Sequence, residues 1–193
     1  MTLRVDAGFS AGERALVARL YWQAFGPKLG KVLGPEPRAL RFIERVLNPR
    51  FALVAREGDV LLGVAGVKTP KGGLVSGKLA DLRAEFGLFG ALWRGLLLSV
   101  LERDLEPGVC QMDGIFVEPS ARGKGVGTAL LTAVADLAHG SGARVVRLDV
   151  IDTNPRAQAL YARHGFEPVS HEGTGPFRWV FGFKSALRME RPV

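Results

Sequence analysis

Apolar positions in the second half of the chain follow two periods in turn. Short runs rich in branched residues at Cys110–Val117 and Val145–Ile151 predict strands. The segments Gly125–Gly140 and Pro155–His164 repeat their apolar residues every three or four positions, which predicts helices. Two closing strands are expected at about Phe166–His171 and Phe177–Met189.

The first half of the chain has a different order of elements. A strand is expected within Thr2–Phe9, followed by a helix that Ser10 and Glu13 begin as a capping box. Gly26–Pro37 is rich in Gly and Pro, which predicts a mobile loop or a broken helix. The next expected elements are a helix at Ala39–Leu47, a hairpin of Phe51–Arg56 and Val60–Lys68, and a glycine-rich connection at Pro70–Gly77.

The most apolar segment, Phe86–Leu101, follows the helical period. It is shorter than the ~20 residues that span a bilayer, and Arg94 interrupts it. We therefore expect a helix that is buried or faces a second copy of the chain in a homodimer, and no membrane partner. Taken together, the elements predict an α/β (α+β) fold with a mixed sheet, because hairpins replace the repeated βαβ units of a doubly wound fold.

Composition narrows the class of protein. The 193 residues, 47% of them hydrophobic, suffice for one domain with its own core. Cys110 is the single cysteine, and Met1–Ser10 has no secretory pattern, so the expected compartment is the cytoplasm. The net charge of +7 would attract polyanions, but the basic residues are scattered and do not alternate with aromatics, so no nucleic-acid partner is expected.

A glycine-rich turn follows the strand that ends at Val117 and leads into a helix. Its residues Arg122–Thr128 contain three glycines and two cations. Amides at a helix start and the helix dipole favour an anion, and glycine lets a phosphate approach the backbone. The turn matches neither the dinucleotide fingerprint nor the nucleoside-triphosphate loop, and by itself it could be a turn that binds nothing.

Two motifs beyond the glycines resemble one family. Arg122-x-x-Gly125-x-Gly127 resembles the R/Q-x-x-G-x-G/A signature of the GNAT superfamily of acyl-CoA-dependent N-acetyltransferases. The segment Asn154–Phe166 resembles its N-x-x-A-x-x-L-Y-x-x-x-G-F segment. The resemblance implies a GNAT-like fold: a mixed sheet of about seven strands, flanked by helices, with two parallel strands that splay apart at the cofactor site.

The resemblance also implies one N-acetyltransferase domain over residues 1–193. Its expected parts are 1–110 with the acceptor-side helices, 111–166 as the acetyl-CoA-binding core, and 167–193 as the closing strands. The co-substrate would be acetyl-CoA. No metal is expected, because His139, His164 and His171 lie far apart and have no ligand-like partners.

In the family, turn amides hold the CoA pyrophosphate, and backbone groups of the preceding strand receive the pantetheine arm. On this chain those strand groups belong to Ile115 and Val117. Asn154 would lie near the arm, although capping of the next helix is an equally good reading. The implied cofactor-binding residues are Ile115, Phe116, Val117, Arg122, Gly123, Lys124, Gly125, Val126, Gly127, Thr128 and Asn154.

Tyr161 is the implied general acid, which protonates the departing CoA sulfur; the alternative is a buried tyrosine in a helix–sheet contact. Attack by an amine also needs a base, and Asp113 is the candidate because a carboxylate in an apolar strand needs a partner or a function. Strict alternation would place Asp113 on the same face as Ile115 and Val117. A salt bridge to an arginine is the structural alternative.

The acceptor is expected to be a primary amine of a small molecule or peptide that enters over Tyr21–Pro37 and Pro70–Leu105. Lys28 and Lys31 are placed to meet an anionic group on it, but nothing selects a substrate. Two other functions stay open. One is a non-catalytic acyl-CoA sensor; the other is an RNA or phosphopeptide binder that uses the same anion site.

Overall fold

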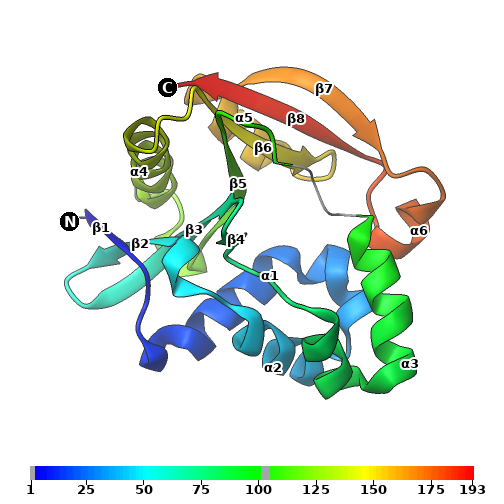
Figure 1. Ribbon diagram of the computed structural model, residues 1–193. Coiled ribbons are helices and arrows are strands. Elements are labelled where there is room, and N and C mark those ends of the chain that lie inside the picture. The colour runs from blue at the N-terminus through cyan, green and yellow to red at the C-terminus, as the bar shows by residue number, and fades with distance from the viewer. Residues whose placement is uncertain (1–2, 101–104) are drawn as a thin grey trace.

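The computed structural model describes residues 3–100 and 105–193. Its sheet has eight strands: seven lie in the order β1-β2-β3-β5-β6-β8-β7, and β4 pairs with β3 (Figure 1). Among the strand pairs of the described residues, only β5–β6 is parallel. The strands are β1 (Leu3–Ala7), β2 (Ala52–Glu57), β3 (Val60–Thr69), β4 (Gly72–Gly73), β5 (Val109–Val117), β6 (Val145–Ile151), β7 (Glu167–Gly173) and β8 (Ser185–Pro192).

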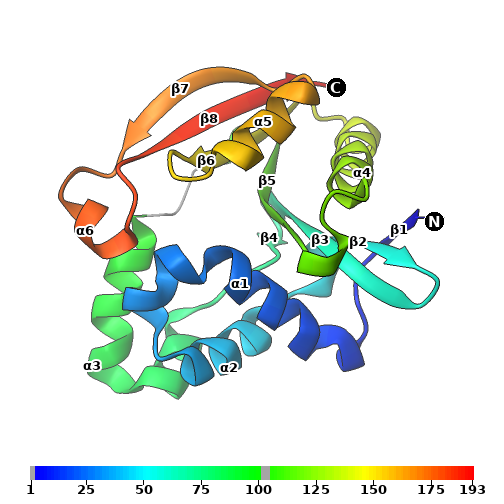
Figure 2. The same ribbon diagram turned by 180° about the vertical axis from the view of Figure 1, so that it is seen from behind.

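This is the predicted mixed α/β architecture. Seen from behind, α1 runs across the lower half of the molecule, and α4 and α5 lie in the upper half (Figure 2). The predicted capping box is present, because the Ser10 amide and hydroxyl both donate to the Glu13 carboxylate at 2.8 Å. The helices are α1 (Arg14–Leu33), α2 (Glu36–Val46), α3 (Leu79–Ser99), α4 (Val126–Gly140), α5 (Pro155–Arg163) and α6 (Arg178–Phe181).

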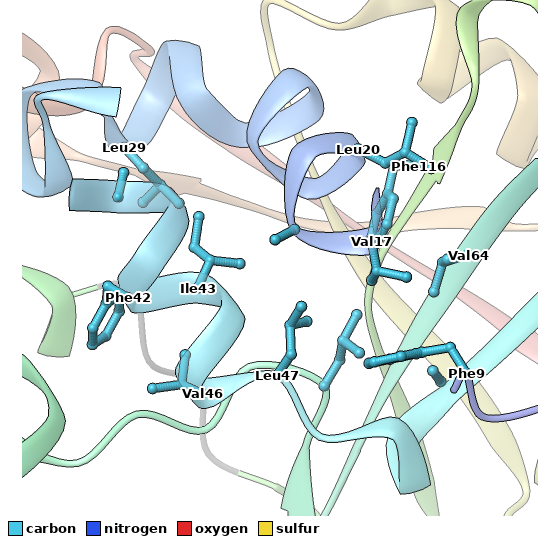
Figure 3. Packing of buried hydrophobic residues seen from close by; sticks show 14 of the residues in the cluster. Phe9, Val17, Leu20, Leu29, Phe42, Ile43, Val46, Leu47, Val64 and Phe116 are labelled. Carbon is cyan, nitrogen blue, oxygen red and sulfur yellow. The ribbon is translucent and has the colours of Figure 1, made fainter. Parts of the chain in front are cut away.

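Two apolar cores cover the two faces of the sheet. The first joins α1 and α2 to the sheet, and Figure 3 shows Val17 and Ile43 pointing toward Val64 and Phe116. In the second core, Leu130 and Leu131 of α4 and Tyr161 of α5 pack with Met112 of β5 and Leu148 of β6. Burial of these faces fixes which side of β5 meets each helix.

The parallel strands β5 and β6 pair over only part of their length. The pairing runs from Val109 opposite Val145 to Met112 opposite Leu148. Beyond Met112, β5 continues to Val117 with β3 as its paired neighbour. The predicted splay between the two parallel strands is therefore present, and it opens toward the start of α4.

A β-bulge interrupts β5 just where the splay begins. Gly66 pairs with Gly114 and Val67 pairs with Met112, which leaves Asp113 as the extra residue on β5. A bulge of this kind shifts the alternation of side chains by one position. The side chains that precede Asp113 on β5 and those that follow it therefore alternate between the two faces of the sheet in opposite register.

Of the two readings of Gly26–Pro37, a mobile loop or a broken helix, the structure has the broken helix: α1 continues through Pro27 to Leu33, and α2 begins at Glu36. Leu29, Val32 and Leu33 are buried there, so packing outweighs the hydrogen bond that proline removes.

The predicted closing strand at Phe177–Met189 was wrong over its first residues. Its first residues form a 3-10 turn and α6, and β8 starts at Ser185. Gly182, at φ 73°, ends α6 in the left-handed region, and Phe181 is buried against Val32.

The apolar helix is α3, which bends at Gly87. Its predicted last residue, Leu101, lies outside the described residues. Phe89 is 84% exposed and Leu96 is 72% exposed, so burial within one chain was wrong for these positions, and the homodimer stays a prediction. Within residues 3–100 and 105–193, no helix combines the length and the hydropathy needed to cross a membrane.

Candidate active site

A cavity of about 580 Å³ lies where β5, α1 and the starts of α4 and α5 meet; we call it the turn cavity. It gathers ten of the eleven cofactor residues expected from the sequence, all except Lys124. Its lining residues are Leu20, Gln23, Ala24, Ile115, Phe116, Val117, Ala121, Arg122, Gly123, Gly125, Val126, Gly127, Thr128, Asn154, Arg156, Ala157, Leu160 and Arg163.

The glycine turn presents backbone amides to this cavity. The amides of Arg122 and Lys124 donate within the turn, to Pro119 and Ala121, each at 3.3 Å. In the described part of the chain, the five other amides of the turn have no backbone acceptor, since the first intrahelical bond of α4 starts at Ala129. These five amides belong to Gly123, Gly125, Val126, Gly127 and Thr128.

Two glycines shape the turn. Gly123 has φ 81° and Gly125 has φ 80°, a region that other residues enter only at a cost. A Cβ atom at either position would meet no atom within 4 Å, so the space in front of both is open. An anion can therefore approach the main chain at the positive end of α4.

Arginines add positive charge around the turn. The Arg122 Nε donates to the Val117 carbonyl at 3.3 Å, which holds this side chain over the end of β5. Arg156 and Arg163, on α5, also line the cavity and were missed in the sequence analysis. Their spacing of seven residues puts them on one side of the helix, and this was the signal that could have found them.

The splay leaves peptide groups of β5 directed at the gap toward β6. The Glu118 amide donates to the Leu62 carbonyl of β3 at 2.8 Å. Because peptide groups alternate along an antiparallel strand, those of Phe116 also face β3, while those of Ile115 and Val117 face the gap. Phe116 lines the cavity, but its backbone groups are not free to bind a ligand.

The turn between β6 and α5 brings Asn154 to the cavity. Its Oδ1 accepts a hydrogen bond from the Ala157 amide at 3.2 Å, so the capping role is present. The residue lines the cavity as well, and the two roles are compatible. At the far end of α5, His164 Nε2 lies 3.0 Å from the Thr128 hydroxyl.

Tyr161 lies behind the cavity wall and is not one of its lining residues. It is 5% exposed, and its ring packs against Phe166 with centroids 5.8 Å apart. Burial raises the pKa of this phenol well above its usual value. The group is therefore protonated throughout the neutral range.

Asp113 is separated from Ile115 and Val117 by the bulge, so the predicted shared face was wrong. Ile115 and Val117 pack toward α4, whereas Asp113 lies on the α1 side with Phe116. The physical reason is the extra residue of the bulge, which reverses the alternation. Asp113 therefore lies on the side of the sheet that α1 and α2 cover, and not on the side that α4 and α5 cover.

Partial desolvation raises the pKa of Asp113, although solvent reaches the residue. Lys68 and Lys28 oppose this shift by their charge, and the Leu74 amide opposes it by donating a hydrogen bond. In the described part of the chain, Asp113 forms no ion pair with an arginine, in contrast to the structural alternative. Its carboxylate also raises the pKa of the buried Tyr21 phenol, where desolvation is the larger cause.

Residues 15–166 match the model of the acetyltransferase (GNAT) family. The chain belongs to this family. The match covers both sequence motifs as well as α1 and α2, for which the sequence offered no motif. The family match therefore includes most of the first half of the chain as well as the residues of the turn cavity.

Curated relatives resemble part of this GNAT chain. A segment of 69 residues is 36% identical to a thialysine N-epsilon-acetyltransferase of Bos taurus and covers 35% of this chain and 41% of that protein. A segment of 59 residues is 42% identical to an uncharacterized N-acetyltransferase of Methanocaldococcus jannaschii, covering 31% and 26%. The matched segments span less than half the length of these relatives.

Solved structures resemble the whole fold. An N-acetyltransferase from Staphylococcus aureus superposes with a TM-score of 0.70 at 15% identity, over 97% of this chain and 99% of that chain. An acetyltransferase of Bacillus subtilis in complex with CoA gives a TM-score of 0.61 at 15% identity, over 100% and 99%. These similarities establish the fold.

The turn cavity fits the family's co-substrate, acetyl-CoA. Its five amides without acceptors and the open space before Gly123 and Gly125 suit a diphosphate, and the splayed edge of β5 offers an extended ligand hydrogen-bonding groups. Among the described residues, no three His, Cys, Asp or Glu side chains gather as they would around a metal ion.

Proposed function

We propose that this chain transfers the acetyl group of acetyl-CoA to a primary amine of a small molecule or peptide by direct attack. The observation that carries the proposal is the row of free turn amides beside the unpaired edge of β5. The amides of Gly123, Gly125, Val126, Gly127 and Thr128 bind the diphosphate, and Arg122 and Lys124 add charge. Acetyl-CoA supplies an activated acyl group as a thioester.

Four groups of the chain serve the transfer. Asp113, or a water beside it, takes a proton from the acceptor ammonium, and the free amine then attacks the acyl carbon. The peptide N–H of Ile115, directed into the splay, stabilises the negative charge that develops on the carbonyl oxygen. Asn154 borders the path of the pantetheine arm. As the new C–N bond forms and the C–S bond breaks, Tyr161 gives its proton to the leaving sulfur. The nitrogen then loses its second proton, which restores the Tyr161 phenol.

Burial of Tyr161 supports its role as general acid, but it also restricts the path by which the hydroxyl can reach the sulfur. A desolvated phenol stays protonated and is available as a donor, which suits a general acid. Its ring lies just behind Leu160 and Ala157, which line the cavity. The hydroxyl must therefore reach the sulfur through the splay between β5 and β6, on whose residues the ring packs.

The test is a screen for CoA release with acetyl-CoA and a panel of primary amines, together with thermal shifts for acetyl-CoA, CoA and ATP. Acetyl-CoA and CoA should raise the melting temperature more than ATP does, because they bind the native state specifically. At least one amine should release CoA. Binding of CoA with no transfer to any amine would indicate a sensor instead. Equal shifts with ATP would indicate a general anion site.

A further inference from the structure

A second cavity, of about 750 Å³, lies at the far end of α1 and does not belong to the turn cavity; we call it the basic cavity. It is formed by the end of α1, the β6–α5 turn, α6 and the residues that precede β8. Its lining residues are Lys31, Asp152, Thr153, Arg178, Trp179, Gly182, Phe183 and Lys184.

The charges of the basic cavity are not balanced. Lys31, Arg178 and Lys184 are cations, and Asp152 is the only carboxylate among the lining residues. Within the described part of the chain, none of the three cations forms an ion pair. The Lys31 ammonium donates to the Trp179 carbonyl at 2.6 Å, which fixes its position without neutralising it.

The Asp152 carboxylate forms its hydrogen bonds with the residues at the start of β8. Its Oδ2 accepts hydrogen bonds from the amides of Lys184 and Ser185, at 3.2 and 3.1 Å, and from the Ser185 hydroxyl at 3.3 Å. The carboxylate therefore stabilises the start of β8 and leaves the Lys184 ammonium unpaired. The Arg178 guanidinium lies 5.1 Å from the centroid of the Trp179 ring, which is 72% exposed. Arg178 and Lys184 are exposed to solvent, and their charges are available to an anion.

One side of α1 contributes residues to both cavities. Leu20, Ala24, Pro27 and Lys31 are spaced by four, three and four residues, so they follow one side of the helix. Leu20 and Ala24 line the turn cavity, and Lys31 lines the basic cavity. Seven residues of helix separate Ala24 from Lys31, which corresponds to a distance of about 10 Å. The β6–α5 turn also borders both cavities, through Thr153 and Asn154.

We propose that the basic cavity binds an anionic group, a carboxylate or a phosphate, of the amine acceptor. The acceptor class is then an amine that carries an anionic group on a spacer, and the helix rise of about 10 Å between Ala24 and Lys31 guides the choice of spacer length. Arg178 and Lys184 bind the anion, and the Trp179 ring covers the spacer. This inference rests on the proposed acetyl transfer for the acceptor's identity, but the anion site itself can be tested without it.

The first experiment measures anion binding with the turn cavity already filled. Phosphate and succinate are titrated calorimetrically into protein saturated with CoA, so that the glycine turn cannot account for the signal. Wild type should bind at least one of them, and Arg178→Gln with Lys184→Gln should weaken binding about tenfold or more. Lys184→Gln keeps the backbone amide that Asp152 needs. Arg50→Gln, which changes an exposed cation of the 3-10 turn before β2 that does not line the cavity, should bind as wild type does.

The second experiment compares matched amines: octylamine, 8-aminooctanoate and an aminoalkyl phosphate of the same length. The anionic amines should show a kcat/KM about tenfold or more above that of octylamine. The double variant should lose this preference, so that its kcat/KM values for the three amines become similar. The better of the two anions identifies the acceptor's charged group.

The outcomes separate the two proposals. Acetylation of all three amines with equal kcat/KM would overturn the inference and leave the transferase intact. CoA binding and variant-sensitive anion binding, without transfer to any amine, would contradict the proposed function while the anion site stands. Absence of anion binding by the CoA-saturated wild type would overturn the site.

Discussion

The hydroxyl of Thr128, in the first turn of α4, lies 3.0 Å from Nε2 of His164 at the end of α5. This contact joins α4 and α5, and both helices border the turn cavity. Thr128 also contributes one of the amides that have no backbone acceptor. The position of that amide therefore depends on a side-chain contact between segments 36 residues apart.

We expect Thr128→Val to weaken CoA binding about fivefold, the value of roughly one hydrogen bond. The change removes the hydroxyl and keeps the backbone amide. Thr128→Ser, which retains the hydroxyl, is the matched control and should bind normally. Calorimetric titration with CoA measures both. Equal affinities for the valine and serine variants would show that the contact does not position the turn.

Gly125→Asp should reduce CoA binding by about tenfold or more, since it introduces a carboxylate where the diphosphate lies. Gly142 is the matched control, because it also has positive φ, meets no atom within 4 Å and follows the other end of α4. Gly142→Asp should cost similar stability and bind CoA normally. If both variants bind CoA alike, the glycine turn is not the diphosphate site.

Tyr161→Phe should lower kcat about 100-fold or more and leave the acetyl-CoA affinity nearly unchanged, because it removes a proton donor and retains the ring against Phe166. Pre-steady-state kinetics and calorimetry measure the two quantities. Tyr21 is the other tyrosine of the chain and lies near Asp113. A larger loss of kcat in Tyr21→Phe than in Tyr161→Phe would assign the acid role to Tyr21.

Asp113→Asn should lower kcat/KM by about 100-fold at neutral pH if the carboxylate is the base. Desolvation raises the pKa of Asp113 above its usual 3.8, so wild-type kcat/KM should fall as the pH decreases through that raised value. The asparagine variant should lack this acid limb. Asp59→Asn, in the exposed β2–β3 turn, is the control. An unchanged pH profile in Asp113→Asn would leave water as the base.

Glu13→Gln should destabilise the protein by about 1 kcal/mol at pH 7, the usual value of a capping interaction. Side-chain hydrogen bonds from Arg56 are the main reason that the pKa of Glu13 falls from 4.5 to about 2. Because the folded-state pKa is lowered, the stabilisation is complete above about pH 4.5 and is lost as the pH falls toward 2. In urea unfolding, the difference in the free energy of unfolding between wild type and Glu13→Gln should be smaller at pH 3 than at pH 7. Glu57→Gln is the control.

Local patterns were sufficient for most elements and for the turn. The capping box at Ser10, the β2–β3 hairpin and the strand–turn–helix around Gly125 depend on residues that are neighbours in sequence, so short-range chemistry specifies them. The same holds for Asn154, whose side chain caps the helix that it precedes. Nine of the eleven expected cofactor residues lie within Ile115–Thr128 and line one cavity for this reason, whereas Asn154 reaches the same cavity through the position of the β6–α5 turn.

Other features depended on contacts between distant segments. The helix through Pro27 persists because Leu29, Val32 and Leu33 find partners elsewhere in the fold, and no local propensity reports that burial. The face of Asp113 is reversed by a bulge, which arises from pairing with β3 and cannot be read from alternation along β5.

The sequence by itself determined most of the order of elements and the glycine turn, because hydrophobic period, capping and glycine act over a few residues. Tertiary structure decided where β5 leaves β6, which side Asp113 faces, and that Lys31 meets Arg178 and Lys184 across a cavity. The physical reason is that these relationships join residues tens to more than a hundred positions apart. Their geometry follows from how the two cores pack against the sheet.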